Sequence, residues 1–326
     1  MSRSDQFRIL VIEMLKQVME IYDLLDSATV DGERVSTLLK TRGIEKAQVE
    51  KIKGKTGSTD FIRVTIPGKE GKSAGGKAPT LGIVGRLGGI GARPERIGIV
   101  SDADGAVVSL SCALKLADMK KNGDTLKGDV ISSTHICPNA PTQPHDPVPF
   151  MGSPVDIATM NKYEIDPAMD AILSVDSTKG NRIVKWRGFA ITPTVKEGWI
   201  LRVSDDLISI MEWVTGKTAR IAPITMQDIT PYGNEVYHIN SIMQPSVATD
   251  APVVGVAITT ETTVPGCATG VSHIVDMETA ARFCLEVAKG FGDGRCKLYD
   301  EMEFKLIEKL YGSMKHLQSL GKNLGS

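Results

Sequence analysis

The stretch Ile97-Gly-Ile-Val-Ser-Asp102-Ala-Asp104-Gly105 sets two carboxylates at the end of a short apolar run. Helical spacing of apolar residues follows over 106–119, and a second apolar run begins at residue 129 and stops at Thr134-His135-Ile-Cys137. This order predicts a strand, a helix and another strand. Because ligands bind outside the carboxyl ends of parallel strands, we expect these Asp, His and Cys side chains to gather at one edge of a sheet.

The alternation continues along the chain. The apolar runs that predict strands cover residues 80–84, 97–100, 129–131, 170–175 and 253–258, and the helical patterns cover 6–26, 32–40, 205–215, 277–289 and 298–320. We therefore expect one α/β domain over residues 1–326, a three-layer sandwich with a mostly parallel central sheet. A Gly- and Lys-rich region at about 50–80, with an alternating run at 61–66, predicts a hairpin with exposed loops.

Composition excludes some partners. The 326 residues carry a formal net charge of -1, which gives no electrostatic reason for nucleic acid or an anionic membrane to bind. A small-molecule or peptide substrate remains open. The first apolar segment, 7–25, is interrupted by charged residues, so we expect neither a signal peptide nor a membrane span and place the protein in the cytoplasm. Five irregularly spaced cysteines indicate reduced thiols.

The candidate metal ligands also have simpler explanations. Asp102 and Asp104 could cap the following helix, and Asp176 lies in a Ser-Thr-Lys-Gly context that is common in turns. His135 and Cys137 are two residues apart, so in an extended segment they share a face. That face could bind a metal ion or belong to the core.

A glycine-rich segment, 85–96, follows the first central strand. Gly88 and Gly89 would let the backbone approach a ligand, and Arg86 or Arg93 could bind a carboxylate or phosphate. The alternative is a surface turn with solvated arginines. Further candidate ligand-binding residues are Asp104, His145, which lies in a proline-rich loop that could form a stiff wall, and Asp250.

The order of these polar strand ends resembles the co-catalytic zinc aminopeptidases. The likeness is to the tetrahedral or glutamyl aminopeptidases without their inserted oligomerisation domain, and it covers about residues 80–290. The chain also resembles a bacterial and archaeal family of domains of unknown function with this architecture. The resemblance implies that Asp102 bridges two metals, that Asp176 completes one metal site and that His273 is the late histidine ligand, with His238 as its substitute.

Two departures from that family limit what the resemblance implies. Where the family has His-x-Asp, this chain has Gly85-Arg86-Leu87-Gly88, and an arginine cannot ligate a cation. Where the family has a Glu-Glu pair that includes the general base, this chain has residues 134–138. His135 or Cys137 could still bind one metal with Asp102 and the late histidine. We therefore expect one zinc or other divalent ion, or none, with Arg86 as a fixed positive charge in place of a cation.

Three functional hypotheses follow. The first is a homo-oligomeric, metal-dependent hydrolase of a small amide or peptide-like substrate. The second is a catalytically inactive relative that binds a small anionic, amino-acid-like ligand through Arg86 and the glycine segment. The third is a structural assembly protein.

Overall fold

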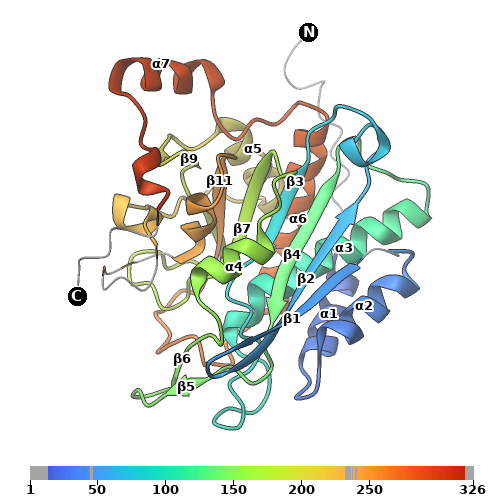
Figure 1. Ribbon diagram of the computed structural model, residues 1–326, viewed down its shortest axis with the longest axis vertical. Coiled ribbons are helices and arrows are strands. Elements are labelled where there is room, and N and C mark those ends of the chain that lie inside the picture. Colours follow the sequence, from blue (N-terminus) through green and yellow to red (C-terminus); the bar gives the residue numbers. More distant parts are fainter. Residues whose placement is uncertain (1–13, 45–46, 232–235, 237, 239–240, 320–326) are drawn as a thin grey trace.

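A mixed sheet with helices on both faces forms the centre of the protein. In the computed structural model, which describes residues 14–44, 47–231, 236, 238 and 241–319, this sheet has nine strands (Figure 1). The strands are β1 Ala47–Gly54, β2 Gly57–Ile66, β3 Leu81–Gly85, β4 Val130–Ile136, β7 Ala171–Ser177, β8 Gly188–Ile191, β9 Val195–Lys196, β10 Trp199–Ile200 and β11 Val253–Thr259. Two short strands, β5 Thr142–Gln143 and β6 Phe150–Met151, pair separately.

The parallel strands occupy the middle of the sheet. The order is β1-β2-β4-β3-β7-β11-β9-β10, with β8 also paired to β11. Neighbours within β4-β3-β7-β11 are parallel, whereas β1, β2, β8, β9 and β10 add antiparallel edges. β11 reads Val-Val-Gly-Val-Ala-Ile-Thr and is buried along its whole length, as expected of a strand covered on both faces. The predicted α/β class with a parallel centre is confirmed.

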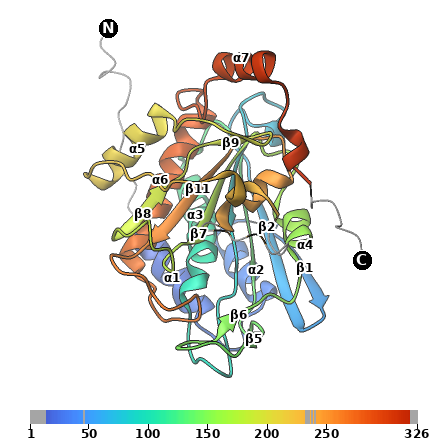
Figure 2. The same cartoon turned by 90° about the vertical axis from the view of Figure 1, so that its left-hand side faces the viewer.

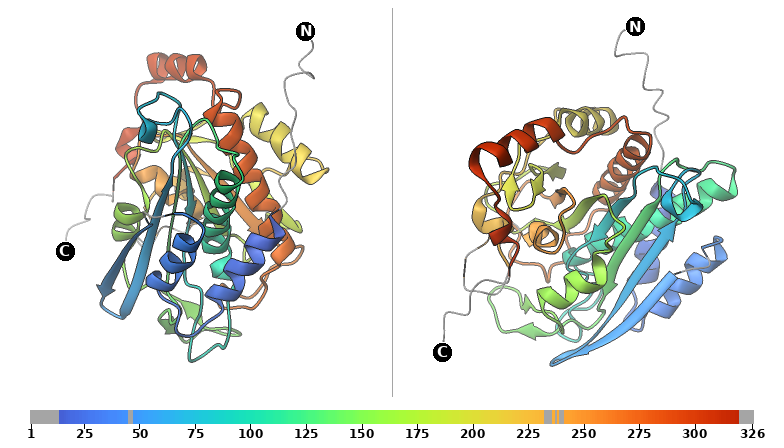
Figure 3. Two further views of the ribbon diagram at one scale, coloured as in Figure 1. Left: turned by 90° about the vertical axis from the view of Figure 1, so that its right-hand side faces the viewer. Right: turned by 45° about the horizontal axis from the view of Figure 1, so that its top comes forward.

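Helices cover the two faces unequally. The helices are α1 Leu15–Leu25, α2 Gly32–Thr41, α3 Asp104–Lys121, α4 Ile157–Glu164, α5 Asp205–Thr215, α6 Ile274–Gly292 and α7 Glu301–Tyr311. α3 packs on β3, β4 and β7, and α6 on β8 and β11, while α1, α2 and α5 add to this side (Figure 3). The opposite face is covered by α4 and by a 3-10 segment, η5 Ser241–Val247. α7 stands at one end of the molecule (Figure 2).

Most predicted elements are confirmed, because the apolar pattern that predicts a helix or strand lies within the residues of that element. The predicted helix at 205–215 is α5, and the glycine- and lysine-rich hairpin is the antiparallel pair β1–β2. Helix 6–26 is confirmed from Leu15 onward; its first part lies outside the described residues. None of the helices in the described part of the chain is long and apolar enough to span a bilayer.

Two expectations are wrong. The run Ile97–Val100 is not a strand but part of the loop between β3 and α3, and the side chain of Ile97 is 97% exposed. The pattern at 298–320 is not one helix, because α7 ends at Tyr311; the next residue, Gly312, has a positive φ of 83°, which favours glycine and breaks the helix. A short 3-10 turn, Lys315–Leu317, follows.

Candidate functional site

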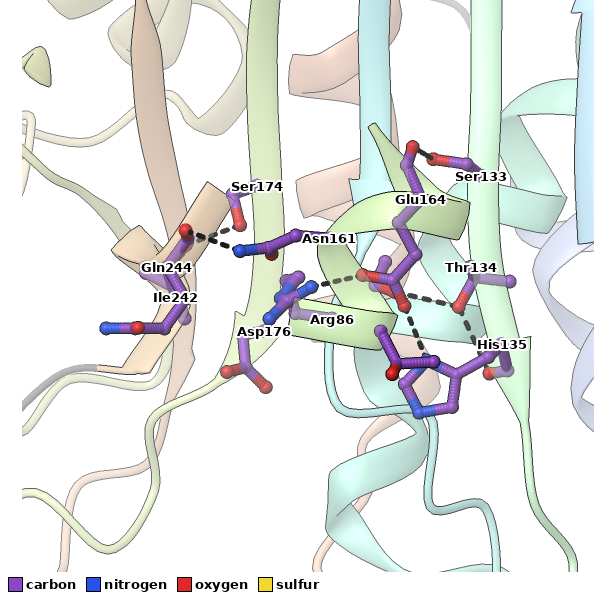
Figure 4. A network of polar contacts seen from close by, with 12 residues as sticks. Arg86, Ser133, Thr134, His135, Asn161, Glu164, Ser174, Asp176, Ile242 and Gln244 are labelled. Atoms are coloured by element: carbon purple, nitrogen blue, oxygen red, sulfur yellow. Dashed lines mark hydrogen bonds and ion pairs between the residues drawn. The ribbon is translucent and has the colours of Figure 1, made fainter. Parts of the chain in front are cut away.

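Three ionisable side chains form a row across the sheet, at the carboxyl ends of its central strands. Gly85 of β3 is level with Thr134 of β4 on one side and with Val175 of β7 on the other. The residues that directly follow Gly85, Thr134 and Val175 are Arg86, His135 and Asp176, respectively. Because side chains alternate along a strand, all three point to the same face. It is the face covered by α4 and η5 (Figure 4).

A buried carboxylate joins two members of the row. Glu164, the last residue of α4, accepts a hydrogen bond from Nη1 of Arg86 and lies 2.5 Å from Nδ1 of His135. The three side chains are almost completely buried, at 0%, 0% and 2% exposure. Burial alone would oppose ionisation, but the positive charge of Arg86 and the hydrogen bonds from Arg86 and His135 hold the pKa of Glu164 below its ordinary value. Glu164 is therefore a carboxylate between two nitrogen donors.

Arg86 is fixed from the Glu164 side only. Its Nε and Nη2 atoms are buried and make no hydrogen bond with the described residues. Figure 4 shows the guanidinium between Glu164 and Asp176. The expectation that the arginines of segment 85–96 form a solvated turn is therefore wrong for Arg86. It continues β3 by donating its backbone N–H to Val175 (2.8 Å), which directs its side chain into the protein.

Asp176 is fully buried at the other end of the row. Its Oδ1 accepts the backbone N–H of Ser177 at 2.7 Å, and its Oδ2 accepts the hydroxyl of Ser241 at 3.2 Å. Burial raises the pKa of Asp176 to about 7, although these two hydrogen bonds and Arg86 act in the opposite direction. The side chain therefore changes its charge near neutral pH.

Asp102 lies beside Asp176 and keeps part of its surface exposed. Its carboxylate makes no hydrogen bond or ion pair with the described residues. Removal of the carboxylate from water is the main cause that raises the pKa of Asp102, and the negative charges of Asp176 and Asp104 raise this pKa further. A Cβ atom on Gly89 would lie 2.7 Å from Cε of Met151 and 3.3 Å from Oδ2 of Asp102, so the glycine lets the backbone pack closely against both side chains.

Asp104 is neutralised by a different partner. It forms a buried ion pair with Lys179, which follows β7 and also donates to the carbonyl of Val271, and it accepts the hydroxyl of Ser272 at 2.8 Å. The helix-capping interpretation of Asp102 and Asp104 is wrong. The residue at the N-cap of α3 is Ala103, and no side chain caps this helix.

Other predicted metal ligands bond elsewhere. The side chain of His273 is 47% exposed, and its Nδ1 lies 3.1 Å from Asp276. Cys137 is buried, which raises its pKa to about 11, and its sulfur contacts the carbonyl of Ser58 at 3.5 Å. Within the described ranges, no three or more His, Cys, Asp or Glu side chains are arranged to hold a metal. The five proposed ligands are therefore not one set; Asp102 and Asp176 come together.

The predicted ligand-binding residues also separate. His145 is exposed and bonds the carbonyl of Val148 (3.0 Å). Asp250 precedes β11, so it lies at the amino edge of the sheet, where its exposed carboxylate pairs with Lys315. Gly88 allows its backbone to pack against that of His135, since a Cβ atom would fall 1.6 Å from the His135 oxygen. His238, the substitute for His273, is half-buried.

Sequence reasoning missed Glu164, Lys179, Ser241 and Ser272. Glu164 ends a short polar helix and looks like a solvent-facing charge, and Lys179 lies in a segment with turn composition. No local pattern distinguishes either from a surface residue. A pocket of about 980 Å³ lies elsewhere, at the amino edge of the sheet near Asp170 and Pro252.

The fold and this edge define a class: an α/β protein with parallel central strands and a buried row of ionisable side chains at their carboxyl ends. The chain belongs to the family described as "Protein of unknown function (DUF1177)", whose model matches residues 50–321. A search of the curated proteins finds no match. Among solved structures, the LapA aminopeptidase of Legionella pneumophila is similar with a TM-score of 0.43 and 10% sequence identity, over 86% of this chain and 71% of that chain. At this distance we transfer neither its residues nor its activity.

Proposed function

We propose that the protein is a hydrolase of a small amide or peptide-like substrate and that Asp102 and Asp176 hold a divalent cation for this reaction. One observation supports this proposal above the others. Asp102 presents a partly exposed carboxylate with no protein partner among the described residues, next to a second, buried carboxylate. Two neighbouring carboxylates repel each other when both are ionised, and a cation between them removes that repulsion.

The donor chemistry fits one kind of ion better than another. Two carboxylates suit an oxygen-preferring cation such as Mg²⁺ or Mn²⁺, which keeps several of its own waters. Zinc prefers three or four nitrogen, sulfur or carboxylate ligands, and the described residues supply no such group. We therefore place Mg²⁺ or Mn²⁺ before zinc.

The surrounding residues prepare this pair for binding. Ser177 and Ser241 fix the orientation of the Asp176 carboxylate, and Lys179 keeps Asp104 paired, so that Asp104 is not a competing ligand. When bound, a divalent cation polarises the scissile carbonyl and makes water a stronger nucleophile. Because the pKa of Asp176 is raised to about 7, protons compete with the cation below neutral pH.

Calorimetric titration of the metal-free protein with MnCl₂ at pH 8 tests the proposal. We expect one ion per chain, binding weakened at least about 10-fold in Asp102→Asn, and no change in the control Asp205→Asn, whose carboxylate is 85% exposed. Release of p-nitroaniline from a panel of amino-acid p-nitroanilides should require Mn²⁺ and be lost in Asp102→Asn. Equal Mn²⁺ binding by Asp102→Asn, or no hydrolysis by the wild type, would overturn the proposal.

A further inference from the structure

The imidazole of His135 has one nitrogen held and one nitrogen free of protein partners. Nδ1 faces Glu164, whereas Nε2 makes no hydrogen bond with the described residues. The ring lies against the backbone of the glycine segment, since a Cβ atom on Gly88 would be 3.4 Å from its Cδ2 atom, and it packs beside Phe61 with ring centroids 5.1 Å apart. The side chain therefore has one defined orientation.

Glu164 determines which nitrogen of His135 carries the proton in the neutral ring. A carboxylate accepts hydrogen bonds only, so Nδ1 must be the donor, and the lone pair stays on Nε2. Arg86 supports this arrangement because its positive charge, on the other oxygen of Glu164, keeps that carboxylate ionised. A carboxylate that orients an imidazole in this way leaves the second nitrogen ready to accept a proton.

The position of the ring relates this nitrogen to the carboxylates. His135 and Asp176 are at the same level on β4 and β7, with β3 between them, and they project from the same face. Two strand spacings separate their backbones by about 10 Å. The buried side chain of Arg86, which follows β3, lies between the two residues on this face.

We propose that His135 is the proton-transfer group of this edge and that Glu164 is its positioning residue; this rests on the proposed hydrolase function. Water attacks the carbonyl carbon of the amide, and its proton passes to Nε2 of His135. The C–N bond then breaks, and the same proton passes to the leaving nitrogen, which yields a carboxylic acid and an amine and regenerates the neutral imidazole. Glu164 keeps its charge throughout.

Glu164→Gln is a specific test, because arginine has only donors. The amide oxygen of Gln must then face Arg86, and its NH₂ group must face Nδ1 of His135, which becomes the acceptor. The proton therefore moves to Nε2, and the base is lost without a change of shape. A matched control is Glu286→Gln, which alters another buried glutamate, paired with Lys289 on α6.

The measurements are the ¹⁵N NMR spectrum of the His135 ring, without substrate or metal, and steady-state kinetics on the p-nitroanilide that the wild type hydrolyses. We expect the Nδ1–H form in the wild type and in Glu286→Gln, and the Nε2–H form in Glu164→Gln. In Glu164→Gln, kcat should fall at least about 100-fold, while KM stays within about twofold.

Two outcomes overturn the inference in different ways. An Nε2–H ring in the wild type, or an unchanged kcat in Glu164→Gln, rejects the roles of His135 and Glu164 and leaves the proposed hydrolase standing. A wild type that hydrolyses no member of the panel rejects the hydrolase and the proton transfer together.

Discussion

Replacing Asp176 by asparagine should stabilise the protein, and increasingly so as the pH rises. Asparagine has the shape of a protonated aspartate: its oxygen can accept the N–H of Ser177, and its NH₂ group can donate to the hydroxyl of Ser241. The substitution therefore removes the charge while it keeps both hydrogen bonds. What changes is the free energy of holding an ionised carboxylate in a buried position.

The direction follows from proton linkage. In the folded protein the pKa of Asp176 is raised to about 7, against an ordinary value of 3.8. Between these values the unfolded chain has lost the proton that the folded protein still holds, so the stability of the wild type falls as the pH rises through this window. Below it both states are protonated, and above it both are ionised.

The magnitude follows from the same numbers. A pKa difference of about 3, at 1.36 kcal/mol each, corresponds to about 4 kcal/mol. Asp176→Asn should therefore be more stable than the wild type by about 4 kcal/mol at pH 8 and by about 2 kcal/mol at pH 5. Asp205→Asn, at an exposed position, should change stability by less than about 0.5 kcal/mol at either pH.

Urea unfolding with EDTA present, followed by circular dichroism at pH 5 and pH 8, measures these differences. EDTA matters because a bound cation would stabilise the wild type and hide the effect. If the gain in the free energy of unfolding of Asp176→Asn over the wild type is no larger at pH 8 than at pH 5, this account of the buried carboxylate is refuted.

Two further predictions concern the neighbourhood of this edge. Lys179→Met should lower the free energy of unfolding by about 3 to 5 kcal/mol, because it leaves the buried carboxylate of Asp104 without its partner. Adding Asp104→Asn should restore most of this loss. Thermal unfolding of the single and the double variant measures the two effects. Gly105→Ala should lower the melting temperature although alanine favours helices, because its Cβ atom would lie 2.4 Å from the Val175 oxygen; Gly270→Ala, with open space around it, should not. A double variant no more stable than Lys179→Met, or a Gly105→Ala protein that melts with the wild type, would contradict these explanations.

The candidate site was only partly predictable. Asp176 could be assigned to this edge because it lies near the carboxyl end of a parallel strand, β7. Asp102 was assigned to the same edge through an expected strand at 97–100, which is a loop; it reaches the edge because that loop connects the end of β3 to the start of α3. Asp250 precedes the predicted strand 253–258, which is β11, so the sequence already indicated the amino edge of the sheet for this residue. His273 could not be excluded from the sequence, because its contact with Asp276 is seen only in the structure.

The sequence by itself determined the α/β class, the main helices and the parallel strands, because apolar periodicity reports which face of an element is buried. It also determined that an acidic side chain, Asp176, lies at the end of one of these strands. Only the tertiary structure decided that Arg86 is buried and that Glu164 reaches it and His135 from α4, 29 residues along the chain from that histidine. Contacts of this kind depend on which elements pack together, and the residue types on a short polar helix do not encode that choice.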